Sequence, residues 1–341
     1  MRTRILGKTG LTVSELCLGS GTFGGLGVYK YAGALDQQQA NRIVDMAIDG
    51  GINFFNTAEI YSDGLAEEIL GRAIGTRRPE SIIITKLHPT KTPGTNDKGL
   101  SRKHLVEGLE ASLKRLGTDY IDILELHQYD FDTPLEITLR TLDNLISQGK
   151  VRYVGCSNFT GWQMMKGLSV SEREHWEKFM TNEVQYSLLN REPEYEIVPA
   201  CVDQGVALLA YSPLYGGFLS GKYARNKPWP EGTRFLDLAH TMPWPVDVDV
   251  LYKVVDTLEG VAAAHGGTVS QAALNWLLAK PAVCSVIMGI RKESQLQDNL
   301  GATEWALTPD EVRQLDAVSE PVRRYPYFML DPVADERKKE F

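Results

Sequence analysis

The sequence predicts an α/β fold, a (β/α)8 TIM barrel with an N-terminal β-hairpin and extra C-terminal helices, for two reasons. Segments with a strand pattern alternate with segments with a helical pattern, at roughly 30–40 residues for each pair. The strand segments are continuous apolar runs, which is typical of parallel strands that are buried on both faces. A doubly wound open sheet is the alternative fold with this alternation. No shift in composition marks a boundary, so residues 1–341 are expected to form a single domain.

The elements follow from local patterns along the chain. Residues 1–18 are predicted to form a hairpin, with Gly7-Lys8-Thr9-Gly10 as its turn. Asp36 is suited to cap the first helix, because its carboxylate can accept hydrogen bonds from free N–H groups. Apolar residues that recur at three and four mark the helices. The predicted helices are 36–49, 66–75, 101–116, 134–148, 161–168, 195–204, about 248–265, 269–280, one that begins at 293, and 309–318. The predicted strands are 52–56, 81–86, 121–127, 151–157, 181–185, 206–212 and 285–289.

The segment 19–24 matches the pattern G-x-G-x-x-G that binds dinucleotides after a strand. That pattern requires a helix to open directly at the glycines. Here GGLGVYKYAG follows, and the next helical pattern begins only near Asp36. The sequence therefore does not predict a Rossmann-type dinucleotide site at these glycines.

Composition and charge exclude several classes of function. The net charge of −8 and the pI of about 5.4 argue against binding to nucleic acid or to an anionic membrane surface. No apolar run has the length of a membrane span, and residues 1–16 lack the apolar core of a signal peptide. The four cysteines are far apart and form no CxxC pair, so we expect reduced thiols and a cytoplasmic protein. The histidines show no HxxxH or HExxH spacing, and no metal is assigned.

Polar or glycine residues stand at the ends of the predicted strands. Because the carboxyl ends of barrel strands form one face, where active sites lie, these residues are expected to converge. Tyr61, which follows the strand 52–56, is expected to join them. The residues at strand ends are Asn56, Lys86, His127, Ser157-Asn158, Gln185, Tyr211-Ser212 and Gly289-Ile290-Arg291.

Several stretches together resemble the aldo-keto reductase superfamily over nearly the whole chain. They are GINFFNTAEIYSDGLAEEILGRAI, IIITKL, SRKHLVEGLEASLKRLGTDYIDILELHQYD, GKVRYVGCSNF, NEVQYSLLNRE, AYSPLYGGFLSGKY and GIRKESQLQDNLGA. The resemblance implies an NADPH-dependent oxidoreductase that reduces aldehydes and ketones to alcohols, reversibly. It also implies that Tyr61 protonates the carbonyl oxygen. A free tyrosine has a pKa of about 10, so a nearby Lys86 would be needed to lower it, and a neutral His127 would orient the substrate oxygen.

Asn56 departs from the family pattern, which has aspartate at this position in a D-T-A-x-x-Y setting. Asparagine can still accept a hydrogen bond from Lys86, as a fourth member of the catalytic group. It supplies no negative charge, however. The sequence therefore predicts that no carboxylate offsets the positive charge of Lys86.

The resemblance also implies which residues bind NADPH or NADP+. Ser157, Asn158 and Gln185 correspond to ligands of the nicotinamide carboxamide, and Tyr211 to the aromatic residue that stacks on the nicotinamide ring. The first barrel loop places Gly21, Thr22 and Phe23 near the nicotinamide. The pyrophosphate loop contains Ser212, Leu214, Gly217 and Lys222. The stretch that binds the 2′-phosphate and adenine contains Gly289, Arg291, Gln295, Asp298 and Asn299.

The sequence identifies the walls of the substrate pocket and the binding partners less specifically than the catalytic residues. The walls are expected to include Phe23, Tyr29, Tyr31, residues 88–99, Trp229 and Trp244, although packing explains these residues equally well. The expected partner is a small carbonyl or alcohol substrate, with no nucleic acid and no membrane, for a monomer or homo-oligomer. A cofactor-binding regulatory subunit with weak or no turnover is the alternative, because some members of this family associate with channels or other partners. A non-redox barrel such as an isomerase is a more distant alternative.

Overall fold

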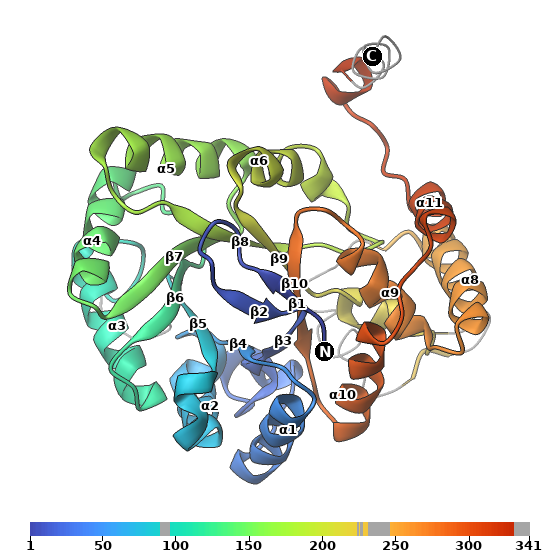
Figure 1. Ribbon diagram of the computed structural model, residues 1–341, viewed down its shortest axis with the longest axis horizontal. Coiled ribbons are helices and arrows are strands. Elements are labelled where there is room, and N and C mark those ends of the chain that lie inside the picture. The colour runs from blue at the N-terminus through green and yellow to red at the C-terminus, as the bar shows by residue number, and fades with distance from the viewer. Residues whose placement is uncertain (89–95, 224, 226–227, 231–245, 331–341) are drawn as a thin grey trace.

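The computed structural model describes residues 1–88, 96–223, 225, 228–230 and 246–330, and a closed barrel of eight parallel strands forms its centre (Figure 1). The order around the barrel is β10-β3-β4-β5-β6-β7-β8-β9. This confirms the predicted (β/α)8 barrel and excludes the open sheet. The strands are β3 Leu16–Gly19, β4 Phe54–Asn56, β5 Ile82–Leu87, β6 Ile121–Leu126, β7 Val151–Ser157, β8 Phe179–Gln185, β9 Ala207–Tyr211 and β10 Val283–Gly289.

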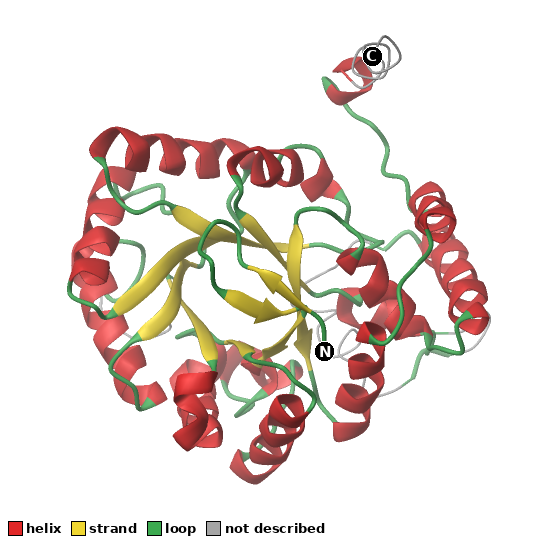
Figure 2. Cartoon of the chain, in the orientation of Figure 1, coloured by secondary structure: helices red, strands yellow, loops and turns green. Residues whose placement is uncertain are grey.

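Helices enclose the barrel, as Figure 2 shows by the red helices around the yellow strands. The predicted cap of the first helix is confirmed: the Asp36 carboxylate accepts a hydrogen bond from Gln39 N at 2.8 Å. The Gln39 side chain accepts one from Asp36 N in return, which satisfies two free N–H groups of the helix start. The helices are α1 Gln37–Asp49, α2 Leu65–Ile74, α3 Arg102–Leu116, α4 Leu135–Ser147, α5 Gly161–Glu174, α6 Ile197–Gln204, α8 Val248–Ala264, α9 Val269–Leu278, α10 Glu293–Leu300 and α11 Pro309–Val318.

The predicted hairpin is confirmed, but it is shorter than 1–18. Its strands are β1 Thr3–Ile5 and β2 Thr12–Ser14, which pair antiparallel. Residues 16–18 were wrongly included, because they belong to the first barrel strand, β3, which pairs parallel with β10. Glu15 lies between the two elements, and its carboxylate pairs with Arg2 and Arg4 of the hairpin. The partner of β3 is far away in the chain, so local sequence could not reveal it.

The end of helix α5 differs most from the predicted helix boundaries, and the rejected motif at residues 19–24 has a structural explanation. Helix α5 continues to Glu174 instead of ending at residue 168, since Val170 and Ser171 remain buried within a polar stretch. At the glycines 19–24 the chain forms only a short 3-10 turn, Ser20–Thr22, and α1 begins at Gln37. The rejection of the Rossmann pattern is therefore confirmed.

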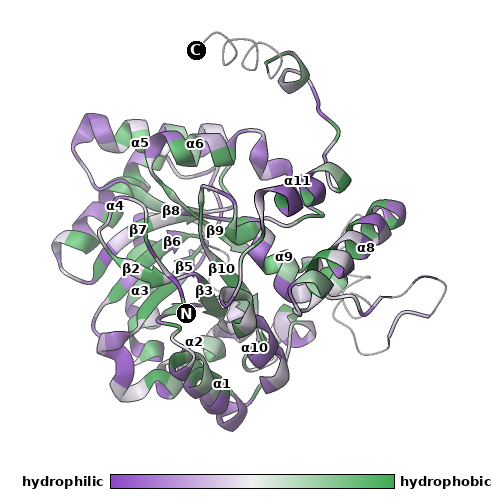
Figure 3. Ribbon diagram, turned by 45° about the vertical axis from the view of Figure 1, so that its right-hand side comes forward, coloured by the Kyte–Doolittle hydropathy of each residue, from purple (hydrophilic) through white to green (hydrophobic). Residues whose placement is uncertain are grey.

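The apolar core lies between the strands and the helices. Helix α4 illustrates its construction: its four predicted face residues, Leu135, Leu139, Leu142 and Leu145, are all buried. Each fully buried leucine side chain contributes about 1.5–3 kcal/mol relative to exposure. Hydrophilic and hydrophobic stretches lie side by side on the surrounding helices in Figure 3, as expected for helices with one buried face. Within the described ranges, no helix is both long and apolar enough to cross a membrane.

Candidate active site

The carboxyl ends of β4, β5 and β6 bring three of the predicted residues together with Tyr61. The Lys86 ammonium group, on β5, is fully buried. It donates hydrogen bonds to Asn56 Oδ1 at 2.7 Å, to Thr57 O at 3.1 Å and to Tyr61 OH at 3.4 Å. His127 follows β6 directly, and its ring centroid lies 6.0 Å from that of Tyr61. The four side chains therefore form one cluster at the rim of the barrel.

The loop after β4 holds Tyr61 in place by unusual backbone geometry. Ser62 and Asp63 both adopt positive φ angles, 51° and 57°, and Gly64 follows at 91°. The Ser62 hydroxyl donates a hydrogen bond to Phe23 O at 2.5 Å, which ties this turn to the first barrel loop. Left-handed residues other than glycine are uncommon and concentrate at functional sites. The tight turn thus positions the phenol against the barrel rim.

The first barrel loop covers the Tyr61 ring. The Tyr29 ring lies with its centroid 4.7 Å from that of Tyr61. A Cβ atom at Gly21 would lie 3.8 Å from the Tyr61 ring, so the Gly21 backbone packs directly against it. The structure thus places Gly21 and Tyr29 against the Tyr61 ring, and their predicted roles beside the nicotinamide and in the pocket wall stay predictions.

His127 is held in its neutral form. Burial lowers the pKa of His127 well below its ordinary value, and the nearby positive charge of Lys86 lowers it further. Its Nδ1 atom is buried and has no hydrogen-bond partner within the part of the chain that the structure describes. A neutral imidazole offers one donor and one acceptor nitrogen. The ring can therefore bind an uncharged oxygen at this rim.

A carboxylate lies beside Lys86, contrary to the prediction from Asn56. Glu183 Oε2, on β8, lies 3.2 Å from Lys86 Nζ, and the Glu183 side chain is only 4% exposed. Asn56 Nδ2 donates a hydrogen bond of 2.6 Å to the same oxygen. The expectation that no carboxylate offsets the positive charge of Lys86 was wrong, because Glu183 supplies the negative charge from β8, on the opposite side of the barrel. A single acidic residue in the strand segment FMTNEVQ was the available signal.

A second buried acid, Glu125, lies on the neighbouring strand β6, where it pairs in register with Lys86. Burial raises the pKa of Glu125 well above its ordinary value, and the neighbouring Glu183 carboxylate raises it further. Glu125 Oε1 accepts a hydrogen bond of 2.6 Å from the Thr181 hydroxyl. A Cβ atom at Gly155 would lie 1.9 Å from Thr181 Oγ1 and 3.1 Å from Glu125 Cγ. Only glycine at this position leaves room for the network.

The residues predicted for the nicotinamide lie at the ends of β7, β8 and β9. Asn158 adopts a φ of 57°, and its amide donates hydrogen bonds to His127 O and Ser157 Oγ, both at 3.0 Å. The Tyr211 hydroxyl donates to Asn158 Oδ1 at 2.9 Å, and burial raises the pKa of Tyr211 to about 12. Gln185 is half-buried, and its backbone oxygen accepts from Asn190. Amide and hydroxyl groups are suited to bind a carboxamide.

The predicted phosphate-binding residues include two cations that lie near each other. Burial lowers the pKa of Lys222, and the positive charge of Arg291 lowers it further. A Cβ atom at Gly217, whose φ is 98°, would lie 2.7 Å from Lys222 Nζ. The Arg291 guanidinium donates to Ala32 O at 2.7 Å and also contacts Tyr31 O. Two neighbouring cations fit the charge of a phosphorylated ligand.

The remaining predicted cofactor residues lie around this region with various partners. The buried hydroxyl group of Thr22 has no partner in the described ranges, and the same holds for Ser20, which was not predicted as a cofactor residue. Gln295 Oε1 accepts from Arg291 N at 2.9 Å and caps α10. Asp298 accepts from Gln271 Nε2 and Thr268 Oγ1, which ties it to α9. The others are placed as follows: Ser212 has a φ of 53°, Leu214 precedes the 3-10 segment Tyr215–Ser220, Gly289 ends β10, and Asn299 is buried.

The predicted pocket walls are only partly within the described chain. Phe23 is fully buried and belongs to the apolar core. Trp229 packs against Phe218 and Tyr223, with ring centroids 5.5 Å apart in both cases. Trp244 and residues 89–95 lie outside the described residues.

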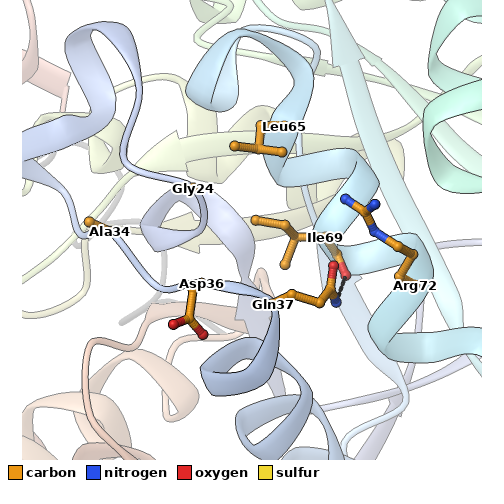
Figure 4. A pocket seen from close by; sticks show the side chains of 7 residues that line it. All are labelled: Gly24, Ala34, Asp36, Gln37, Leu65, Ile69 and Arg72. Atoms are coloured by element: carbon orange, nitrogen blue, oxygen red, sulfur yellow. Dashed lines mark hydrogen bonds between the residues drawn. The ribbon is translucent and has the colours of Figure 1, made fainter.

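A separate groove lies between α1 and α2 (Figure 4). Gln37 Nε2 donates to Ile69 O at 3.1 Å within it. Asn56, Tyr61, Lys86 and His127 do not line this groove. Its lining is largely aliphatic and lacks the close polar cluster seen at the barrel rim, so the rim remains the candidate active site. The lining residues are Gly24, Ala34, Asp36, Gln37, Leu65, Ile69 and Arg72.

Comparison with known proteins adds independent information. The model of the Aldo/keto reductase family matches residues 15–320. A protein of Arabidopsis thaliana named probable voltage-gated potassium channel subunit beta is 37% identical over 337 residues, 96% of this chain and 100% of that protein. The uncharacterized oxidoreductase YrpG of Bacillus subtilis is 35% identical, over 93% of this chain and 96% of its own length. Versiconal hemiacetal acetate reductase of Aspergillus parasiticus is 29% identical, over 94% and 98%.

Proposed function

The chain belongs to the aldo/keto reductase family, and we propose that it is an NADPH-dependent enzyme that reduces aldehydes or ketones to alcohols, reversibly. The observation that carries the proposal is the contact of 3.4 Å between the buried Lys86 ammonium and the Tyr61 hydroxyl. A cation at this distance prepares a phenol to exchange a proton near neutral pH.

The residues of the rim divide the chemistry between them. NADPH, when bound, supplies a hydride to the carbonyl carbon. Tyr61 gives its phenolic proton to the carbonyl oxygen, and the Lys86 ammonium stabilises the tyrosinate that remains. Neutral His127 donates a hydrogen bond that orients the carbonyl oxygen. In the oxidation direction, the tyrosinate takes the proton of the alcohol.

The predicted ligand residues would hold the cofactor along the rim. Ser157, Asn158 and Gln185 would bind the carboxamide, and Tyr211 would cover the nicotinamide ring. The pyrophosphate would lie along Ser212, Leu214, Gly217 and Lys222. Arg291 would bind the 2′-phosphate through charge-assisted hydrogen bonds, which favours NADPH over NADH.

The experiment that tests the proposal is a turnover assay. The purified protein is mixed with excess NADPH and a reactive carbonyl such as nitrobenzaldehyde or a quinone, and NADPH absorbance is followed. Many molecules of NADPH oxidised for each protein molecule support the reductase. The absence of turnover with a panel of sugar, steroid and aromatic carbonyls would exclude it.

A cofactor-binding subunit is the second candidate function. It is favoured by the relative named as a probable potassium channel subunit beta, which aligns over its whole length. This function predicts tight binding of NADPH without multiple turnovers. The same assay, combined with a cofactor-binding titration, therefore separates the two candidates.

The replacement Arg291→Ala is expected to weaken NADPH binding by about 1.5–3 kcal/mol, the size of a hydrogen bond to a charged group. Affinity for NADH should change little, because NADH has no 2′-phosphate. Binding is measured by titration of protein fluorescence with each cofactor. Arg313→Ala, in an exposed arginine of α11, is the matched control. Equal losses for both cofactors would show that Arg291 acts through its contact with Ala32 instead.

A further inference from the structure

Glu183 contacts both Lys86, which lies beside the Tyr61 hydroxyl, and Asn56. Its Oε2 atom lies 3.2 Å from Lys86 Nζ, and Lys86 Nζ lies 3.4 Å from Tyr61 OH. Asn56 bridges the two sides, because its amide donates to Glu183 at 2.6 Å and its oxygen accepts from Lys86 at 2.7 Å. The ammonium group is therefore shared between a carboxylate and the phenol.

We propose that Glu183 is a positioning residue that keeps Tyr61 protonated by offsetting the positive charge of Lys86. The proposal rests on the proposed reductase function, in which Tyr61 is the proton donor. Without an adjacent negative charge, the field of a buried ammonium would favour tyrosinate, and a tyrosinate cannot protonate a carbonyl oxygen. With Glu183 present, Tyr61 stays protonated before the reaction. Lys86 then stabilises the tyrosinate only when the proton is transferred to the carbonyl oxygen.

The other ionisable groups near Glu183 do not supply this charge. Burial raises the pKa of Glu125 well above its ordinary value, and the neighbouring Glu183 carboxylate raises it further, which favours the neutral form of the acid on β6. Burial also raises the pKa of the Cys17 thiol on β3, and the Glu183 charge raises it further. Tyr211 on β9 has its pKa raised to about 12 and is neutral. His127 is neutral as well. Within the described interior, Glu183 is the carboxylate that makes an ion-pair contact with Lys86, at 3.2 Å.

The decisive variants are Glu183→Gln and the double variant Glu125→Gln/Glu183→Gln. Glutamine can still accept from Asn56, so the shape is kept and only the charge is removed. The Glu125→Gln change prevents that acid from ionising in place of Glu183. Glu125→Gln alone is the matched control, since it replaces a neutral acid by a neutral amide, and it should behave as the native protein.

The measurement is the titration of Tyr61. Because the chain has 14 tyrosines, phenolate absorbance of each variant is compared with its Tyr61→Phe counterpart across pH. The two contacts through Lys86, of 3.2 and 3.4 Å, place the Glu183 carboxylate within about 7 Å of the Tyr61 hydroxyl. At an effective dielectric constant of about 20, removal of this negative charge should lower the titration midpoint by about one to two pH units. The alkaline limb of the reduction rate should move down in parallel.

A relocation variant separates charge from shape. In Asn56→Asp/Glu183→Gln, the carboxylate moves across the 2.6 Å hydrogen bond and again contacts Lys86. Its Tyr61 midpoint should return to that of the native protein. An unchanged midpoint in Glu125→Gln/Glu183→Gln, or a midpoint that stays low in the relocation variant, would overturn the proposal.

Failure of a variant to fold and absence of turnover also have defined consequences for the proposal. If Glu183→Gln does not fold, the relocation variant must fold and titrate as the native protein, and its failure to do so also overturns the proposal. The titration needs no turnover, so it is independent of the reductase assay. Failure of the native protein to oxidise NADPH would refute the proposed function, whereas an active protein with an unshifted midpoint would refute only the role of Glu183.

Discussion

Replacement of Tyr61 by phenylalanine is expected to lower the rate of carbonyl reduction at least about 100-fold, the typical contribution of a general acid. The change removes only the hydroxyl group. The ring keeps its packing against Tyr29 and His127, at centroid distances of 4.7 and 6.0 Å. Folding and NADPH binding should therefore remain. Turnover with nitrobenzaldehyde and a fluorescence titration with NADPH measure the two effects separately.

The matched control for this experiment is Tyr120→Phe. Tyr120 directly precedes β6 and so lies at the opposite end of the barrel from the rim. Loss of its hydroxyl should leave turnover nearly unchanged. If Tyr61→Phe retained most of its activity, the proton would have to come from another group, and His127 would be tested next.

Replacement of Lys86 by methionine is expected to cost both stability and activity. Methionine fills a similar volume but leaves the buried Glu183 carboxylate without its cation. Removal of one partner of a buried ion pair costs about 3–5 kcal/mol, which urea denaturation would detect. Turnover should fall by at least about 100-fold, because the tyrosinate is no longer stabilised.

The double variant Lys86→Met/Glu183→Gln separates these two effects. It removes both charges, so most of the lost free energy of unfolding should return, as for other buried pairs replaced by neutral groups. Turnover should stay low, since the ammonium is still absent. A Lys86→Met protein as stable as the native one would show that the pair is not coupled in the folded state.

Much of the fold could be predicted because its signals are local. Buried parallel strands appear as apolar runs, and the polar residues at their ends, such as Lys86 and His127, mark the rim. The capping role of Asp36 depends on residues within one helical turn. The family membership was also accessible, because its motifs extend over nearly the whole chain. The catalytic and cofactor roles of individual residues stay predictions.

What could not be predicted depends on partners distant in sequence. Residues 16–18 belong to the barrel because of strand pairing with β10, which begins at Val283. Glu183 contacts Asn56 across 127 positions of sequence. Asparagine at position 56 therefore appeared to leave Lys86 without a carboxylate, whereas Glu183 supplies that carboxylate from β8. Its place in β8, on the same face as Thr181, could have indicated an inward acid.

The closure of the barrel between β3 and β10 has a consequence for synthesis. The ribosome produces β3 among the first residues and β10 near the end, yet the two strands pair directly. Until residue 289 has emerged, the nascent chain presents unpaired strand edges, to which other chains can add. Contacts this distant in sequence also form slowly. A polypeptide released before β10 would keep both edges open and is expected to aggregate, so the closed barrel requires complete translation.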